Sequence, residues 1–152
     1  MACLRDLFRL AVAGLCLWPV ALVAQPLPDP AGYISRVSGE ALVTSRGITS
    51  ELLPGQAVIE GMTLHSGPGG GLAVIFEDGT VMSFGPDSEL HLERYRFTPA
   101  IGAFALEARF ERGTLSIESG AITRLDPDAI NLRTPDARVR VRAGHALLKV
   151  SR

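Results

Sequence analysis

The part of the chain that most constrains its fold is residues 61–90, where short apolar runs alternate with glycine-containing turns. The runs Leu72–Phe76 and Val81–Phe84 flank an Asp-Gly-Thr sequence. Asp-Gly between β-prone runs is a strong signal for a hairpin or tight corner, because glycine adopts positive φ without steric cost. Turn residues at Gly67–Gly71 and Gly85–Ser88 bound the two runs. The pattern therefore predicts short strands separated by sharp turns.

Seven residues of such turns are expected to have structural roles. They provide positive φ, a fixed φ or a short side chain that bonds to the nearby backbone. They are Asp78, Gly79, Thr80, Gly85, Pro86, Thr134 and Pro135.

The rest of the chain is also typical of strands. Ala103–Glu111 contains good helix formers, but its apolar residues fall on alternate positions, a period of two that favours a strand. Other strand candidates are 33–44 with a break at Ser38-Gly39, 90–97, 113–117 and 120–124. We therefore predict an all-β domain, a short twisted β-solenoid or stacked β-layers, with little helix.

A weak internal repeat supports this architecture. Residues 62–67 match 130–135 in pattern, and each segment is followed by a strand, a glycine turn and a second strand. A long repeat of short strands and turns fits a solenoid or two stacked β-layers.

The first 24 residues have the pattern of a secretory signal peptide. Arg5 and Arg9 form a basic region, and 10–24 is an uncharged run that ends in the small residue Ala24. This run is shorter than the roughly 20 apolar residues that a membrane span needs. We therefore predict a signal peptide at 1–24, a proline-rich lead-in at 25–31 and a β domain at 32–152. The alternative is a signal segment that is kept as an anchor.

Cysteine positions and charge exclude some kinds of site and argue against some kinds of partner. Both cysteines, Cys3 and Cys16, lie in the signal segment, so the mature chain is expected to have no disulfide, thiol nucleophile or cysteine metal site. Without 1–24 the chain carries 13 basic and 15 acidic residues, yet 131–152 alone has a net charge of +5. This asymmetry can steer partners. Net acidity and the expected export argue against nucleic acid.

The order of the motifs resembles the periplasmic domain of the ferric citrate sensor (FecR) family. The matching pieces, in order, are 32–41, 61–68, Asp78-Gly79-Thr80, Gly85–Ser88, Gly113–Leu115 and Thr134–Arg142. The last piece departs from the family pattern at Ala143-Gly144-His145. The resemblance implies an all-β, solenoid-like unit that works through protein contacts. The family's control of a sigma factor is not carried over, because residues 1–25 offer no cytoplasmic signalling part.

Three arginines form the candidate partner site. Arg138, Arg140 and Arg142 alternate with valines, and the period of two places all three guanidinium groups on one face of a strand. That face is suited to an anionic polymer or an acidic protein of the cell envelope. The alternative is a solvated edge that discourages aggregation, with Glu107, Glu111 and Glu118 as pairing partners across the sheet.

No group of residues predicts catalysis. The histidines His65, His91 and His145 lack metal-ligand spacing. The carboxylate pairs Glu77-Asp78 and Asp126/Asp128 are explained by strand and turn geometry. No nucleophile elbow or phosphate-binding loop is present.

We therefore expect an exported, non-catalytic FecR-like module that binds or scaffolds proteins, is periplasmic or secreted, and uses no cofactor or metal. Two alternatives stay open. One is a small periplasmic hydrolase that acts on glycan or peptide through a histidine with Glu or Asp. The other is a structural subunit of a surface assembly.

Overall fold

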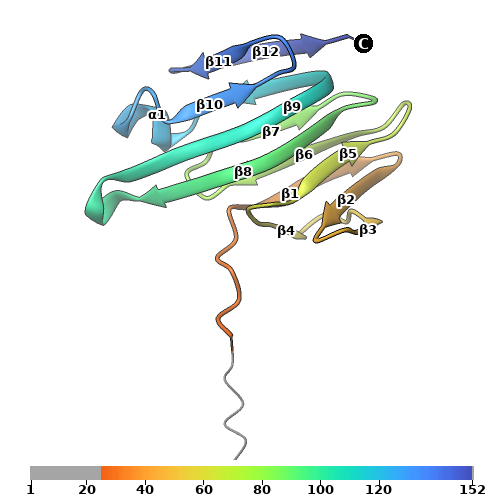
Figure 1. Ribbon diagram of the computed structural model, residues 1–152, viewed down its shortest axis with the longest axis horizontal. Coiled ribbons are helices and arrows are strands. Elements are labelled where there is room, and N and C mark those ends of the chain that lie inside the picture. Colours follow the sequence, from red (N-terminus) through yellow and green to blue (C-terminus); the bar gives the residue numbers. More distant parts are fainter. Residues whose placement is uncertain (1–24, 152) are drawn as a thin grey trace, which may run out of the picture.

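The computed structural model describes residues 25–151, and strands account for most of them (Figure 1). The strands are β1 (Gly32–Ser38), β2 (Ala41–Ser45), β3 (Ile48–Glu51), β4 (Ala57–Val58), β5 (Thr63–Ser66), β6 (Gly71–Phe76), β7 (Val81–Phe84), β8 (Glu89–Thr98), β9 (Ala103–Glu118), β10 (Ile130–Arg133), β11 (Arg138–Val141) and β12 (His145–Val150). The helical elements are the 3-10 turn η1 (Pro99–Ile101) and the short helix α1 (Ala121–Leu125). The all-β prediction with little helix is confirmed.

The strands form a sheet that folds over into two layers. One layer contains β4, β1, β6, β7, the second half of β9 and β12. The other contains β3, β2, β5, β8, the first half of β9, β10 and β11. Neighbouring strands are antiparallel except for β9 and β10. Stacked β-layers therefore describe the fold, and several neighbouring strands, such as β5 with β8 and β6 with β1, are not consecutive in the chain.

The fold-over occurs where glycine-rich corners lie beside one another. Gly67 donates its N–H to the carbonyl of Glu40, and Gly85 donates to the carbonyl of Thr114, so each corner bonds to the next. A Cβ on Gly70 would lie 2.6 Å from the Glu40 carbonyl oxygen. The backbones approach too closely for any larger residue there. The glycines that punctuate residues 61–90 therefore mark the crease of the sheet.

Strand β9 belongs to both layers. Its first half pairs with β8 and β10, and its second half pairs with β7 and β12. The strand bends at Gly113, which has a φ of 98°. Residues 103–111 and 113–117, expected to be two strands, are therefore one strand across the crease.

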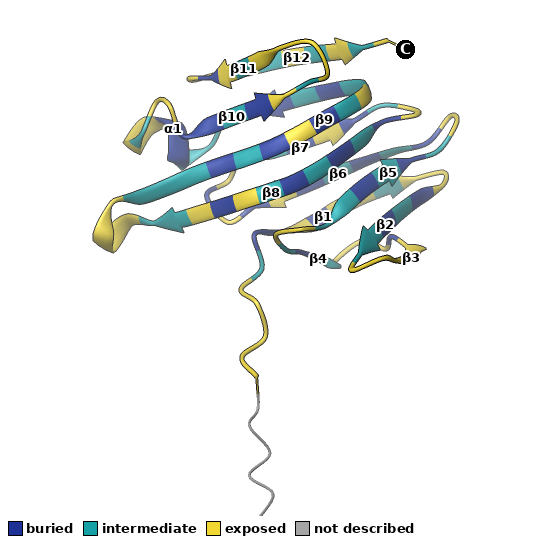
Figure 2. Ribbon diagram, viewed as in Figure 1, coloured by how far each residue is buried: buried dark blue, intermediate teal, exposed yellow. Residues whose placement is uncertain are grey.

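The core lies between the two layers (Figure 2). Alternate residues face inward, as the period of two predicts: Ile34, Val74, Met82 and Ile117 from one layer, and Leu64, Leu90, Phe110 and Leu132 from the other, are all nearly inaccessible to solvent. Outward positions in the second layer are mostly polar. This alternation is typical of sheets with one buried face and one solvated face.

Two details of the sequence analysis were wrong. Residues 120–124 were expected to be a strand, but Gly120 precedes α1. The two copies of the internal repeat also fold differently. In the first, β5 is followed by a crossing to the other layer and then by the β6–β7 hairpin. In the second, the β10–β11 hairpin comes first and the crossing follows it.

The predicted signal peptide, residues 1–24, lies outside the described residues. Residues 25–30 run as an irregular, mostly exposed segment from the end of the molecule where β4 and β3 lie (Figure 1). Ala31 is buried and donates its N–H to the carbonyl of Val58. Within residues 25–151, no helix is long and apolar enough to cross a lipid bilayer.

Candidate partner-binding surface

The three candidate arginines lie at the opposite end of the molecule from the lead-in. Arg138 and Arg140 are on β11, and Arg142 follows it directly. The hairpin that carries them turns at Thr134-Pro135, where Thr134 donates its N–H to the carbonyl of Ala137 (2.8 Å). The Thr134 hydroxyl oxygen also accepts the N–H of Ala137 (3.0 Å). Thr134 and Pro135, expected to have a structural role, thus form the turn that brings β11 beside β10.

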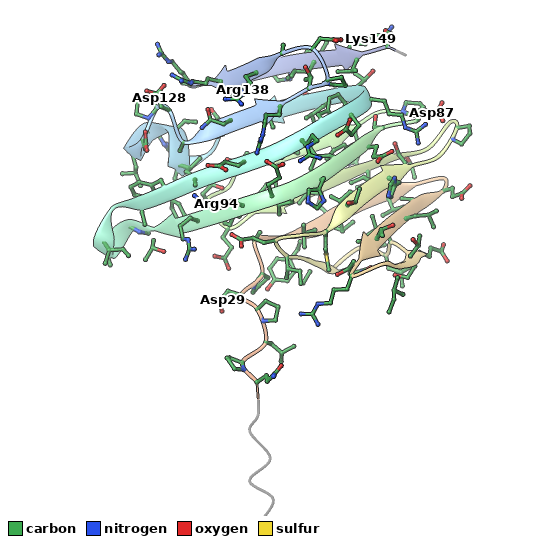
Figure 3. The ribbon with its side chains drawn as sticks, in the orientation of Figure 1. Asp29, Asp87, Arg94, Asp128, Arg138 and Lys149 are labelled. Atoms are coloured by element: carbon green, nitrogen blue, oxygen red, sulfur yellow. The ribbon has the colours of Figure 1, made fainter. Side chains whose placement is uncertain are left out.

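The alternation predicted for β11 is seen in its burial. Arg138 and Arg140 are exposed, Val139 is half-buried and Val141 is buried. The guanidinium groups of Arg138 and Arg140 therefore share the solvent face of the second layer. Figure 3 shows Arg138 at this end of the molecule.

The arginines do not pair with the glutamates that the sequence suggested. Arg142 Nε lies 3.2 Å from Asp128 Oδ1, and Arg140 Nη1 lies 4.0 Å from the same oxygen. All three side chains are more than half exposed, so these pairs are weak. Arg138 makes no ion pair with any described residue. Of the expected glutamates, Glu107 pairs with Arg94 and Glu111 with Arg109.

Beside the arginines the surface is hollowed. A groove of about 420 Å³ is lined by Glu107, Asn131, Leu132, Arg133, Arg138 and Arg140. These residues come from β9, β10 and β11, which are adjacent in the sheet. Three arginines and one carboxylate line the groove, so it is suited to an anionic group.

Glu93 on β8 pairs with two arginines next to the groove. Its carboxylate accepts hydrogen bonds from Arg109 (2.8 Å) and Arg133. Burial alone would raise the pKa of Glu93, but the bonds and charges of Arg133 and Arg109 outweigh it, and the pKa lies below its ordinary value of 4.5. Arg133 is thereby fixed in place at the edge of the groove.

The Asp-Gly-Thr corner has a different role. Asp78 and Thr80 are buried, whereas Gly79 is exposed and has a φ of 83°. The Asp78 carboxylate accepts hydrogen bonds from the Tyr95 hydroxyl (2.9 Å), the Thr80 hydroxyl and the N–H of Ile122 (3.2 Å). Burial, then the charge of Asp78, raise the pKa of the Tyr95 hydroxyl, so it stays protonated and donates.

This corner also anchors α1. Ala121 donates its N–H to the carbonyl of Asp78 (2.8 Å), and Gly120 donates to the Thr80 hydroxyl (3.0 Å). A Cβ on Gly120 would lie 2.4 Å from the Thr80 nitrogen. We call Asp78, Thr80, Tyr95 and the backbone of 120–122 the Asp78 cluster. It joins the β6–β7 turn to β8 and α1, and none of its buried side-chain polar atoms lacks a hydrogen-bond partner.

The Gly85-Pro86 turn belongs to the crease. The Gly85 carbonyl accepts hydrogen bonds from the hydroxyls of Ser66 (2.6 Å) and Ser88 (2.9 Å). The Ser88 hydroxyl oxygen also accepts the N–H of Thr114 (3.0 Å). Pro86 is exposed and ends β7. This turn therefore fixes the bend of β9.

The histidines lie apart from these features. His65 lies 3.7 Å from Glu89 and His91 bonds to Thr63, both on the face of the second layer. His145 bonds to Ser116. Within the described residues, no group of three or more His, Cys, Asp or Glu side chains is arranged to hold a metal ion.

Sequence reasoning missed three residues of the surface. Asn131 and Arg133 alternate with buried Ile130 and Leu132 on β10, a period of two that the sequence contains. The role of Asp128 as the shared partner of two arginines had no signal in the sequence, because it depends on how the 126–128 turn packs beside β11.

Comparison with known proteins adds little. No protein-family model matches the chain, and no curated protein matches it. A solved structure titled "Cell surface anchoring domain" is 31% identical, and the match covers 40% of this chain and 82% of that chain with a TM-score of 0.39. A TM-score this low supports no argument about fold or function.

Proposed function

We propose that this chain is an exported, non-catalytic β-domain of the FecR type that binds an anionic partner in the cell envelope through its β10–β11 end. The FecR assignment rests on the ordered turn motifs of the sequence. The positions of those motifs in the structure support it, because the turns form the crease and the Asp78 cluster.

The observation that carries the binding function is the set of arginines at one edge of the stack. Arg138, Arg140 and Arg142 are exposed, and the exposed Asp128 lies within 4.0 Å of Arg140 and Arg142. Arg133 extends the same positive surface into the groove. Such a cluster attracts an anion most strongly at low salt, because exposed charges are screened.

Binding can be tested with two matched double variants. Arg138→Ala/Arg140→Ala removes the arginines of β11. Arg36→Ala/Arg46→Ala removes two exposed arginines near the opposite end and changes net charge equally. An acidic polypeptide such as polyglutamate serves as the first probe, and a sulfated polysaccharide as the second.

The β11 variant is expected to weaken binding of the probes by about tenfold, whereas the control variant retains it. Raising the salt should weaken binding by the wild type more than binding by the β11 variant. Equal losses in both variants would mean that net charge alone attracts the probe, and the proposed site would be wrong.

Export has its own test. Mass spectrometry of the protein from its host is expected to give a mature chain that starts at Gln25, in the periplasm or the medium. An intact Met1 on membrane-bound protein would contradict cleavage and support a tethered sensor.

A further inference from the structure

The edge that carries the arginines also has unpaired backbone. Strand β11 pairs with β10 and with no other described strand. It is therefore an edge strand of the second layer, and an edge strand presents free N–H and C=O groups that a further strand can use.

The register shows which residues present those groups. Thr134 and Ala137 form the hydrogen-bonded pair that closes the hairpin. Hydrogen-bonded and non-hydrogen-bonded pairs alternate along an antiparallel ladder. The next pair, Arg133 with Arg138, is therefore non-hydrogen-bonded, as is Asn131 with Arg140. The N–H and C=O groups of Arg138 and Arg140 point away from β10, toward the open edge.

Arg138 and Arg140 thus offer an incoming chain both backbone groups and charge. A strand that pairs antiparallel with β11 would place residues directly opposite Arg138 and Arg140, with their side chains on the same solvent face. Acidic side chains at those positions would lie next to the guanidinium groups. The residues between them would face the inner side, where Val139 is half-buried against the core.

A second copy of this chain fits the edge poorly. Symmetric pairing of two β11 strands would bring the arginines of one copy against those of the other, and like charges directly opposite are destabilising. Charge complementarity instead favours an acidic segment from another protein.

We propose that the free edge of β11 binds an extended segment of a partner protein by strand addition, with acidic residues at alternate positions and apolar residues between them. This inference rests on the proposed function and specifies the class of partner as protein. Affinity would come from main-chain hydrogen bonds, and specificity from the two arginines.

The test uses synthetic Glu-Val-Glu-Val-Glu peptides and the full mature chain. Opposite Arg138 and Arg140, the glutamates form hydrogen-bonded pairs, so their N–H groups point toward β11 and the valine N–H groups point away. Two peptides are compared with the unmodified one. The first carries N-methyl groups on glutamates, and the second carries them on valines.

Methylation of the glutamates is expected to weaken binding by about tenfold or more, and methylation of the valines much less, because only the former removes hydrogen bonds to β11. Charge reversal by Arg138→Glu/Arg140→Glu should switch preference to a Lys-Val-Lys-Val-Lys peptide. A gain of binding to the lysine peptide also shows that the charge-reversed variant is folded, because an unfolded protein would have no β11 edge to bind it.

Equal binding of the two methylated peptides would overturn strand addition. If that binding still required Arg138 and Arg140, the proposed anion-binding function would stand without it. If the wild-type protein bound no anionic probe at all, the proposed function itself would be wrong. If Arg138→Ala/Arg140→Ala only increased self-association of the protein and left peptide affinity unchanged, the arginines would serve to keep edges apart, and the inference would be wrong.

Discussion

The Asp78 cluster and the β11 edge are both strongly polar, but they differ in burial. The Asp78 carboxylate is nearly inaccessible and has three donors, one each from its own turn, β8 and α1. Arg138 is exposed and forms no ion pair with any described residue. Enclosed polar groups must be satisfied within the fold, whereas exposed charges retain the capacity to bind something else. The comparison predicts that one region governs stability and the other governs binding.

The largest effect is expected from Asp78→Ala. It leaves the Tyr95 and Thr80 hydroxyls without their acceptor, so unfolding in urea should show a loss of about 3 kcal/mol. Asp78→Asn keeps the shape and one oxygen acceptor and should cost clearly less. A loss below about 1 kcal/mol for Asp78→Ala would mean that the cluster does not hold α1 and β8 to the corner.

The crease provides the next comparison. Gly113 and Gly79 both have positive φ, but a Cβ on Gly113 would lie 2.2 Å from the Ser88 hydroxyl oxygen, whereas nothing lies within 4 Å of one on Gly79. Gly79→Ala should therefore cost about 1 kcal/mol from the backbone alone. Gly113→Ala should cost about 1–2 kcal/mol more because Ser88 must move. Thermal unfolding of the two variants measures this difference, and equal losses would contradict the close packing at the crease.

Glu93 links stability to pH. Its pKa in the folded state lies below its ordinary value, so the unfolded chain binds more protons in acid. The contribution of Glu93 is present above pH 4.5 and is lost as the pH falls through the lowered pKa of the folded state. Glu93→Gln should therefore cost about 1 kcal/mol at pH 7 and progressively less below pH 4. Denaturant titrations at several pH values test this, and a constant difference would contradict it.

The smallest effect is expected from Arg138→Ala/Arg140→Ala on stability. Both side chains are exposed, so the free energy of unfolding should change by less than about 0.5 kcal/mol while anion binding falls. Circular dichroism and urea unfolding provide the check. A large loss of stability would break the distinction between the two regions.

The sequence predicted strands well because the signals for them are local. The alternation in 103–111 and the Asp-Gly corner after Phe76 depend on residues close together in the chain, and both were confirmed. The helix at Ala121–Leu125 was missed because it is very short and is anchored by Asp78 and Thr80, more than 40 residues earlier. No periodicity within the helix could reveal that.

For the candidate surface, the sequence predicted the alternation of arginines and valines in β11 but not the carboxylates that lie near the arginines. The period of two in 138–142 placed Arg138 and Arg140 correctly on one face. Which carboxylates lie near them depends on which strands are adjacent, and the parallel pairing of β10 with β9 has no local signal. The internal repeat was wrong for the same reason. A glycine turn has the same sequence pattern whether it closes a hairpin or connects the two layers.

Because β9 pairs with strands of both layers, it determines when the fold can be completed during synthesis of the chain. A polypeptide that emerges N-terminus first presents β1–β8 before the strand that both layers share. Hairpins such as β6–β7 can form at once from local contacts, but β7 and β8 each lack one neighbouring strand until residues 103–118 have emerged. Folds dominated by non-local pairing form slowly, in milliseconds to seconds. Until then the edges of β7 and β8 stay open, and exposed strand edges of this kind are prone to mispairing.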